Sequence, residues 1–376
     1  MANKGEMSEL YTLFRLAAER SLQLANVDFE AIPDTFIEIK EVIREGKDGK
    51  LEAIPDEDGV VHILLDGVEK FELSQSRMGE LADITFRSMI TDGNYEQAEL
   101  FLDEADCSRV KSDSSSKTDI TLRVHDARSG TDPVVRYSIK SDVGQKSTLY
   151  NATPGAMFTY EIKGEMNDEL MKKINAFQND SVVEDSEITT KTRGKVKKKF
   201  AYLADKGFKL EFVPDESPFI SNLMYVDSGF PKVLAEMTAL YYSKARLTDI
   251  HKITDMVIES NPLHVPIAIA RNFYVYKVRQ FLELAALGMT QGTPWNIRES
   301  VTGGIILVKR NGDIVCYHLF DRDEFQNHLF QFAKIDTPST SRHNPSQIWK
   351  TVDGKYRISV AMQIKLDKTK GEIAIG

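Results

Sequence analysis

Asp119 and Lys140 are the two side chains whose types and surroundings point most directly to chemistry. Each lies beside or within a short run of alternating apolar residues, 120–124 and 135–139, which is typical of a strand. The link at 127–133 contains a glycine and a proline and predicts a turn. Two adjacent strands would then carry a carboxylate and an amine in one sheet. Such a pair suits metal-assisted phosphodiester hydrolysis, in which the acid anchors a divalent cation and the lysine acts on the attacking water and the phosphate charge.

On spacing alone, a β-hairpin with solvated polar ends explains the same pattern. The surrounding sequence adds more. Ser138–Ile162 reads Ser-Ile-Lys-Ser, a glycine-containing loop, Thr-Leu, Asn-Ala and an aromatic-rich strand, and the lead-in at 115–122 contains Asp-Ile-Thr-Leu. Later blocks are a Pro-Ser-Thr-Ser-Arg-His loop at 338–343 and a strand ending Gln-Ile-Lys-Leu at 363–366. In order over residues 74–366, these blocks resemble the HpaII family of type II restriction endonucleases.

The resemblance implies an α/β fold with a mixed central β-sheet flanked by helices, a restriction-endonuclease-like PD-(D/E)xK core. It also implies magnesium-dependent, site-specific hydrolysis of double-stranded DNA that leaves 5′-phosphate ends. Asp119, Ser138 and Lys140 are the catalytic residues that it predicts. The chain departs from the common pattern at Ser138, where an acid usually stands two residues before the lysine, and at Lys365 and Leu366, where the family reads Arg and Phe.

One aspartate is a poor magnesium site, because this hard cation prefers several oxygen ligands. The resemblance implies a further acid from the helix before the catalytic strands, and Glu80 matches that position. Glu161, farther along the chain, is the rival, and a solvent-facing role for Glu80 stays open. The carbonyl of Ile139 would complete the set of metal ligands with Asp119, and waters would fill the remaining positions.

Base recognition usually employs Arg or Lys toward guanine and Asn or Gln toward adenine. Arg342 and His343, in a serine-rich loop, and Gln145 and Lys146, just beyond the catalytic strand, are candidate DNA contacts. Lys117, which leads into the first strand, is a further one. A structural ion pair is the alternative role for Arg342.

The composition is that of a globular protein: among 376 residues, 41% are hydrophobic and 28% charged. No apolar segment approaches the ~20 residues of a membrane span, the N-terminus lacks a signal peptide, and two cysteines predict no disulfide framework. We therefore expect a cytoplasmic protein. The net charge of −9 opposes nonspecific coating of nucleic acid, but basic residues gather at 191–209 and after 342. The lysine run at 195–200 predicts either a solvated helix face or contacts to phosphates.

The chain divides in our interpretation into an accessory segment, 1–73, and an endonuclease catalytic and DNA-recognition domain, 74–376. The first contains an amphipathic helix over 6–25 and a hairpin over 61–71 with an Asp-Gly turn. Ser74 is the expected cap of the next helix.

A homodimer is expected, because a palindromic target needs two active sites, or else a pairing with a second endonuclease subunit. A cognate DNA methyltransferase belongs to such a system without necessarily being bound. The alternative function is a DNA-binding subunit with little or no catalysis, motivated by Ser138. A third hypothesis, motivated by the negative net charge, is an α/β protein unrelated to nucleic acid.

Overall fold

The computed structural model describes residues 4–367, apart from residues 27, 29, 47–48, 92, 108–117, 128, 144–146, 180–193, 245, 298–299 and 340–345. The five expected DNA contacts all lie outside these described residues: Lys117, Gln145, Lys146, Arg342 and His343.

The described residues form a mixed α/β protein. Its α-helices are α1 (Lys4–Glu19), α2 (Gln75–Ile90), α3 (Glu96–Glu104), α4 (Asp168–Asn175), α5 (Lys195–Asp205), α6 (Pro218–Met224), α7 (Phe230–Ser243), α8 (Ile250–Ser260), α9 (Ile267–Leu287) and α10 (Arg322–Phe332). Its largest sheet contains β1 (Ser21–Ala25), β2 (Ala31–Gly46), β3 (Gly49–Pro55), β4 (Val60–Leu65), β5 (Val68–Ser74), β6 (Ile120–His125), β7 (Val134–Ser141), β11 (Gly304–Val308) and β12 (Ile314–His318).

The order of the large sheet is β1-β12-β11-β7-β6-β2-β3-β4-β5, and a further pairing of β1 with β2 closes six of these strands into a ring. Most neighbours are antiparallel, but β7 runs parallel to β11 and β1 runs parallel to β12. The predicted mixed α/β class is therefore confirmed. The ring was not expected from the sequence.

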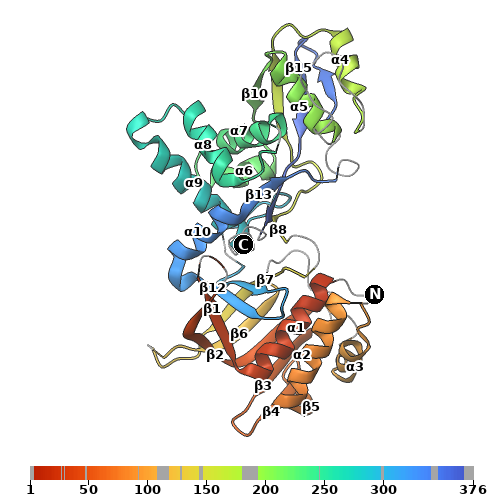
Figure 1. Cartoon of the computed structure of the whole chain (residues 1–376), viewed down its shortest axis with the longest axis vertical. Coiled ribbons are helices and arrows are strands. Elements are labelled where there is room, and N and C mark those ends of the chain that lie inside the picture. The colour runs from red at the N-terminus through yellow and green to blue at the C-terminus, as the bar shows by residue number, and fades with distance from the viewer. Residues whose placement is uncertain are drawn as a thin grey trace, which may run out of the picture.

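Helix α1 packs against β2, β3 and β7 and lies beside α2, as Figure 1 shows in its lower part. The helix predicted over 6–25 ends earlier, at Glu19. Arg20 takes a left-handed backbone conformation (φ 55°), and the chain continues as β1. Pairing explains this difference, because the Leu22 side chain is buried while the β1 backbone bonds to two strands.

The hairpin of β4 and β5 turns at Asp66 and Gly67, whose φ angles are 52° and 77°. Two consecutive positive φ angles define the type I′ turn that an Asp-Gly pair favours, so this prediction is confirmed. Ser74 also caps α2, since its hydroxyl accepts a hydrogen bond from the Arg77 amide. The expected boundary between 73 and 74 falls one residue before the end of β5, and one hydrophobic cluster includes residues from both sides of it. The boundary stays a prediction.

The rest of the chain surrounds a second hydrophobic cluster, in the upper part of Figure 1. One small sheet has the order β10-β9-β15-β14 and the other β13-β16-β8. Their strands are β8 (Thr148–Tyr150), β9 (Phe158–Lys163), β10 (Lys209–Val213), β13 (Ala333–Asp336), β14 (Ile348–Lys350), β15 (Tyr356–Val360) and β16 (Gln363–Leu366). Among the described helices, none is both long enough and apolar enough to cross a membrane.

The lysine run in α5 differs from both sequence-based interpretations. Lys199 is fully buried and donates a 2.9 Å hydrogen bond to the carbonyl of Ser346. Lys198 is also buried and donates to the carbonyls of residues 178 and 179. Lys197 lies over the ring of Tyr241. These amines bind this chain's own carbonyls and ring faces, so α5 presents no continuous row of free lysines to solvent or DNA.

Candidate active site

Asp119 lies immediately before β6, at the point where this strand meets β7. The two strands are antiparallel, with Ile120 opposite Tyr137, and the Asp119 amide donates to the Tyr137 carbonyl at 2.9 Å. The Asp119 carboxylate oxygen Oδ2 accepts two hydrogen bonds, from the Ile139 amide (2.6 Å) and from the Ser138 hydroxyl (3.0 Å). Strand pairing therefore holds this carboxylate against β7.

Lys140 joins the same group through Ser138. Its ammonium nitrogen Nζ donates to the Ser138 oxygen Oγ at 2.7 Å, and that hydroxyl in turn donates to Asp119. Ser138 and Lys140 are two residues apart on one strand, so their side chains share a face of the sheet. The structure thus brings together the three residues that the sequence predicted as catalytic, in one chain of hydrogen bonds.

Ser138 occupies the strand position of the usual carboxylate and takes over only part of its role. A hydroxyl can donate one hydrogen bond and accept others, so it orients the lysine and the aspartate at once. It cannot supply negative charge to a cation. Ser138 is 1% exposed, so its side chain is held in place by its neighbours. A magnesium site would still require a second acid.

The two acids proposed for that role lie elsewhere. Glu80 is on α2, where its carboxylate forms a 2.9 Å ion pair with Arg77 and is 60% exposed. Glu161 is on β9, in a different sheet, where it pairs with Lys163 and Lys355. The structure therefore brings neither Glu80 nor Glu161 to the Asp119 side chain.

Glu9 is a buried acid in the N-terminal half of α1. Burial raises the pKa of Glu9 to about 7, the Arg44 guanidinium beside it opposes that rise, and the negative charge of Asp119 adds to it. Arg44, on β2, donates from Nη2 and Nε to the Glu9 oxygen Oε2 at 3.0 and 3.2 Å. Glu9 is thus a buried carboxylate within electrostatic reach of the predicted catalytic aspartate.

Sequence reasoning missed Glu9 because an acid in an amphipathic helix ordinarily faces solvent. One feature of α1 nevertheless indicates that Glu9 is buried. Helix α1 is apolar around most of its circumference, and every residue from Met7 to Phe14 is buried. Such a helix is enclosed on several sides, and a charge within it needs a partner.

The residues around Asp119 fit a divalent cation. Both hydrogen bonds to the Asp119 carboxylate go to Oδ2. The amide and the carbonyl of one strand residue point to the same side, so the Ile139 carbonyl faces the edge where its amide meets Asp119. A carboxylate oxygen and a backbone carbonyl are among the oxygen ligands that magnesium prefers, and waters or a further acid would complete the set.

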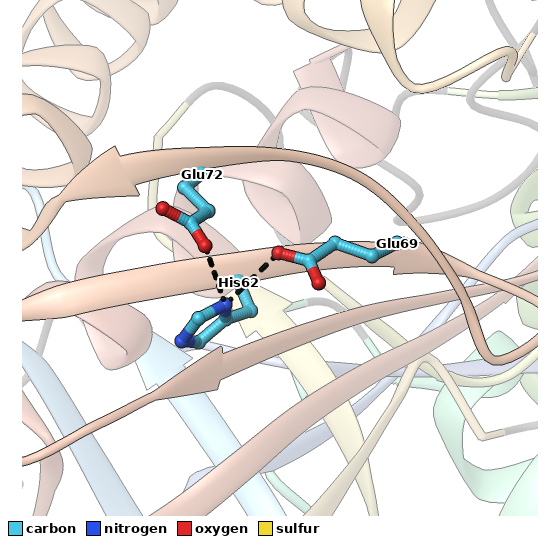
Figure 2. Close-up of side chains that lie close together, drawn as sticks. All are labelled: His62, Glu69 and Glu72. Carbon is cyan, nitrogen blue, oxygen red and sulfur yellow. Dashed lines mark hydrogen bonds and ion pairs between the residues drawn. The ribbon is translucent and has the colours of Figure 1, made fainter.

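A second group of acids lies on the hairpin of β4 and β5 (Figure 2). His62 Nδ1 is 3.0 Å from Glu69 Oε1 and 3.4 Å from Glu72 Oε1, and the three side chains could hold a metal ion. His62 and Glu72 are cross-strand partners, and a register shift after Ile63 brings Glu69 to the same face. The glutamates are 50% and 58% exposed, so this group belongs to the surface.

An α/β protein whose adjacent strands join an aspartate, a serine and a lysine has the catalytic elements of a metal-dependent nuclease. Comparison with known proteins makes the class specific. The family profile described as HpaII restriction endonuclease matches residues 3–366. The type II restriction enzyme HpaII of Haemophilus parainfluenzae is 32% identical over 370 residues, covering 96% of this chain and 98% of the relative. The chain belongs to the HpaII restriction endonuclease family and is a homologue of a type II restriction enzyme.

No solved structure matches the chain. The mixed α/β architecture is therefore described by this structure alone, and the PD-(D/E)xK core remains a prediction.

Proposed function

We propose that this protein is a type II restriction endonuclease that hydrolyses both strands of a specific DNA sequence with a divalent cation, magnesium in the cell. The observation that carries the catalytic part is the hydrogen-bonded chain from Lys140 through Ser138 to Asp119. Family membership over nearly the full length supports the substrate class.

In this mechanism Asp119 and the Ile139 carbonyl would hold the cation, which would supply positive charge to the phosphate and lower the pKa of a bound water. Lys140, oriented by Ser138, stabilises the negative charge that develops on the phosphate oxygens. The water oxygen forms a bond to phosphorus in line with the leaving O3′, and the P–O3′ bond breaks. The attacking water gives one proton to solvent and the leaving O3′ takes one proton from solvent, so the products carry a 5′-phosphate and a 3′-hydroxyl.

Cutting both strands of a symmetric site requires two copies of this active site, which supports a homodimer. Pairing with another endonuclease subunit is the alternative. The candidate base contacts Arg342, His343, Gln145 and Lys146, with Lys117 as a further DNA contact, belong to the same proposal. A cognate methyltransferase would protect the host's own sites.

The test is incubation of the purified protein with unmethylated phage DNA, with magnesium or with EDTA. Lys140→Ala is the test variant, and Lys163→Ala is the matched control, because Lys163 pairs with Glu161 on a different sheet. We expect discrete fragments that require magnesium, persist in the control and vanish with Lys140→Ala. Sequencing of the ends then gives the target and the end chemistry.

Intact DNA under every metal condition, together with a shift in gel mobility, would overturn the catalytic proposal. The alternative of a DNA-binding subunit without catalysis would then hold. Circular dichroism of Lys140→Ala establishes whether a loss of cutting reflects the missing amine.

A further inference from the structure

The small sheet of β13, β16 and β8 has one polar face. Strand alternation and register put five polar side chains on it: Lys334, Asp336, Gln363, Lys365 and Thr148. The residues that alternate with them are apolar and buried in the upper hydrophobic cluster: Ile335, Ile364 and Leu366. The polar face therefore carries amines, an amide and a carboxylate that the cleavage mechanism does not use.

This face begins where the catalytic strand ends. The Ser147 hydroxyl donates to the Ser141 carbonyl at 2.8 Å, and the Ser147 carbonyl accepts from the Leu366 amide at 2.9 Å. Ser141 directly follows Lys140 in β7, and Leu366 directly follows Lys365 in β16. In Figure 1, β13 and β8 lie directly above β7. A duplex whose phosphate is held at Lys140 would therefore lie beside the end of β16 as well.

Asp336 holds two donors of this face side by side. Its carboxylate oxygen Oδ2 accepts from Lys365 Nζ at 2.8 Å and from Gln363 Nε2 at 3.0 Å. Its other oxygen, Oδ1, accepts from the Thr337 amide at 2.9 Å. The side chains of Lys365 and Asp336 are 24% and 40% exposed, so the pair is fixed in orientation and still open to solvent.

The two amines of the face differ in their partners. Lys334 lies between two carboxylates, those of Asp249 and Asp367. Lys365 pairs, among the described residues, with one carboxylate, that of Asp336. An ammonium group has three donors and the bond to Asp336 uses one, so Lys365 can donate to a further acceptor.

We propose that Lys365 reads a guanine of the target DNA in the major groove and that Asp336 is the positioning residue that orients its amine. Guanine presents two acceptors there, N7 and O6, and lysine is one of the side chains that match them. A lysine held by a carboxylate keeps one orientation, which base readout requires and contact with a phosphate charge does not. The inference rests on the proposed function and adds a specificity-determining residue to it.

A purely structural ion pair between β13 and β16 is the competing explanation. It predicts a small change in stability when the pair is lost, because exposed ion pairs contribute little. It predicts no change in the DNA sequence that the protein prefers. Measurement of sequence preference therefore separates the two explanations.

The experiment selects bound duplexes from a library of random sequence, with Ca²⁺ in place of Mg²⁺ so that the readout is binding. The proteins are the unaltered full chain, Lys365→Met and the control Lys350→Met. Lys350 lies on β14 in the other small sheet, and its ion pair with Asp168 is also exposed. Lys365→Met should lose its preference for guanine at one position of the selected site by roughly 5- to 150-fold, the range for one good contact to a base edge. Lys350→Met should select the same site as the unaltered chain.

Lys365→Gln should produce a change that a structural role cannot. Adenine offers an acceptor at N7 and a donor at N6, which match a glutamine amide, so the preference at that position should move from guanine to adenine. Asp336→Asn removes the charge that orients Lys365. It should weaken the preference for guanine at the same position, by less than Lys365→Met does.

Two results with Lys365→Met would overturn the inference. Equal weakening of every sequence would show that Lys365 contacts a phosphate, and an unchanged selected site would show that the ion pair is structural. If Lys365→Met does not fold, as judged by its melting temperature, the preference of Lys365→Gln decides in the same way.

Failure of the proposed function looks different from failure of this inference. The unaltered chain would then select a DNA site but cut no DNA with any metal, and the role of Lys365 would still be read from the selected sequences. If the unaltered chain selects no site at all, the inference is wrong.

Discussion

Two groups of acidic side chains in this protein could attract a cation, and the structure surrounds them differently. Glu9 pairs with Arg44 between α1 and β2 and is 8% exposed, and the half-buried Asp119 lies at the start of β6. Glu69 and Glu72 lie on a hairpin at the end of the same sheet and are 50% and 58% exposed. Residue types alone would rank the second group higher, because it includes a histidine.

The carboxylate pKa shifts in opposite directions in the two groups. In the interior, burial raises the pKa of Glu9 despite the adjacent Arg44. On the hairpin, the hydrogen bond from His62 lowers the pKa of Glu69, and the same contact raises the pKa of His62. A surface group of this kind satisfies its own charges in water. We assign the catalytic function to Asp119, because its carboxylate is joined by hydrogen bonds to Ser138 and through it to Lys140.

The largest expected effect is on catalysis. Asp119→Asn keeps the shape of the side chain but removes its charge, so cleavage should fall by roughly 10²- to 10³-fold, the range for removing a group that stabilises transition-state charge. Cleavage rates with saturating magnesium provide the measurement. Glu69→Gln is the matched control on the hairpin and should cut normally. If Glu69→Gln were the damaging change, the assignment of the two groups would be reversed.

The next effect is on stability. Arg44→Met leaves Glu9 buried without its partner, which should lower the free energy of unfolding by about 3–5 kcal/mol. Glu72→Gln on the exposed hairpin should change it by less than about 1 kcal/mol. Urea unfolding followed by circular dichroism measures both. Equal, small losses in the two variants would mean that the Glu9 pair is as hydrated as the hairpin pair.

Ser138→Ala should have a smaller effect on cleavage than Asp119→Asn. It removes the hydroxyl that joins Lys140 to Asp119 but leaves both charged groups and the Ile139 amide contact. Hydrogen bonds to charged groups contribute about 1.5–3 kcal/mol, so cleavage should fall roughly 10- to 100-fold. An unchanged cleavage rate would remove Ser138 from the proposed mechanism.

Local pattern predicted the two strands of this site, and the family resemblance selected its residues. Alternating apolar residues on both sides of a Gly- and Pro-containing link predicted β6 and β7, and strand alternation then placed Ser138 and Lys140 on one face. The same reasoning could not predict the buried pair of Glu9 and Arg44, because these residues meet only through the packing of α1 against β2. Burial of Lys199 was missed for the same reason, because its carbonyl partner at Ser346 is distant in the chain.

The smallest effect should come from His62, whose pKa is raised by hydrogen bonds first to Glu69 and then to Asp56, with Glu72 adding its charge. The unfolded histidine binds its proton less tightly, so the stabilisation is complete below its ordinary pKa and is lost as the pH rises through the folded value. We expect the unaltered chain to be more stable than His62→Gln at pH 6, by less than about 1 kcal/mol, and the difference to close by pH 9. Urea unfolding across this range measures it, with cleavage unchanged throughout. A loss of Mn²⁺ binding in His62→Gln would instead show that the exposed hairpin holds the metal, and the comparison between the two groups would fail.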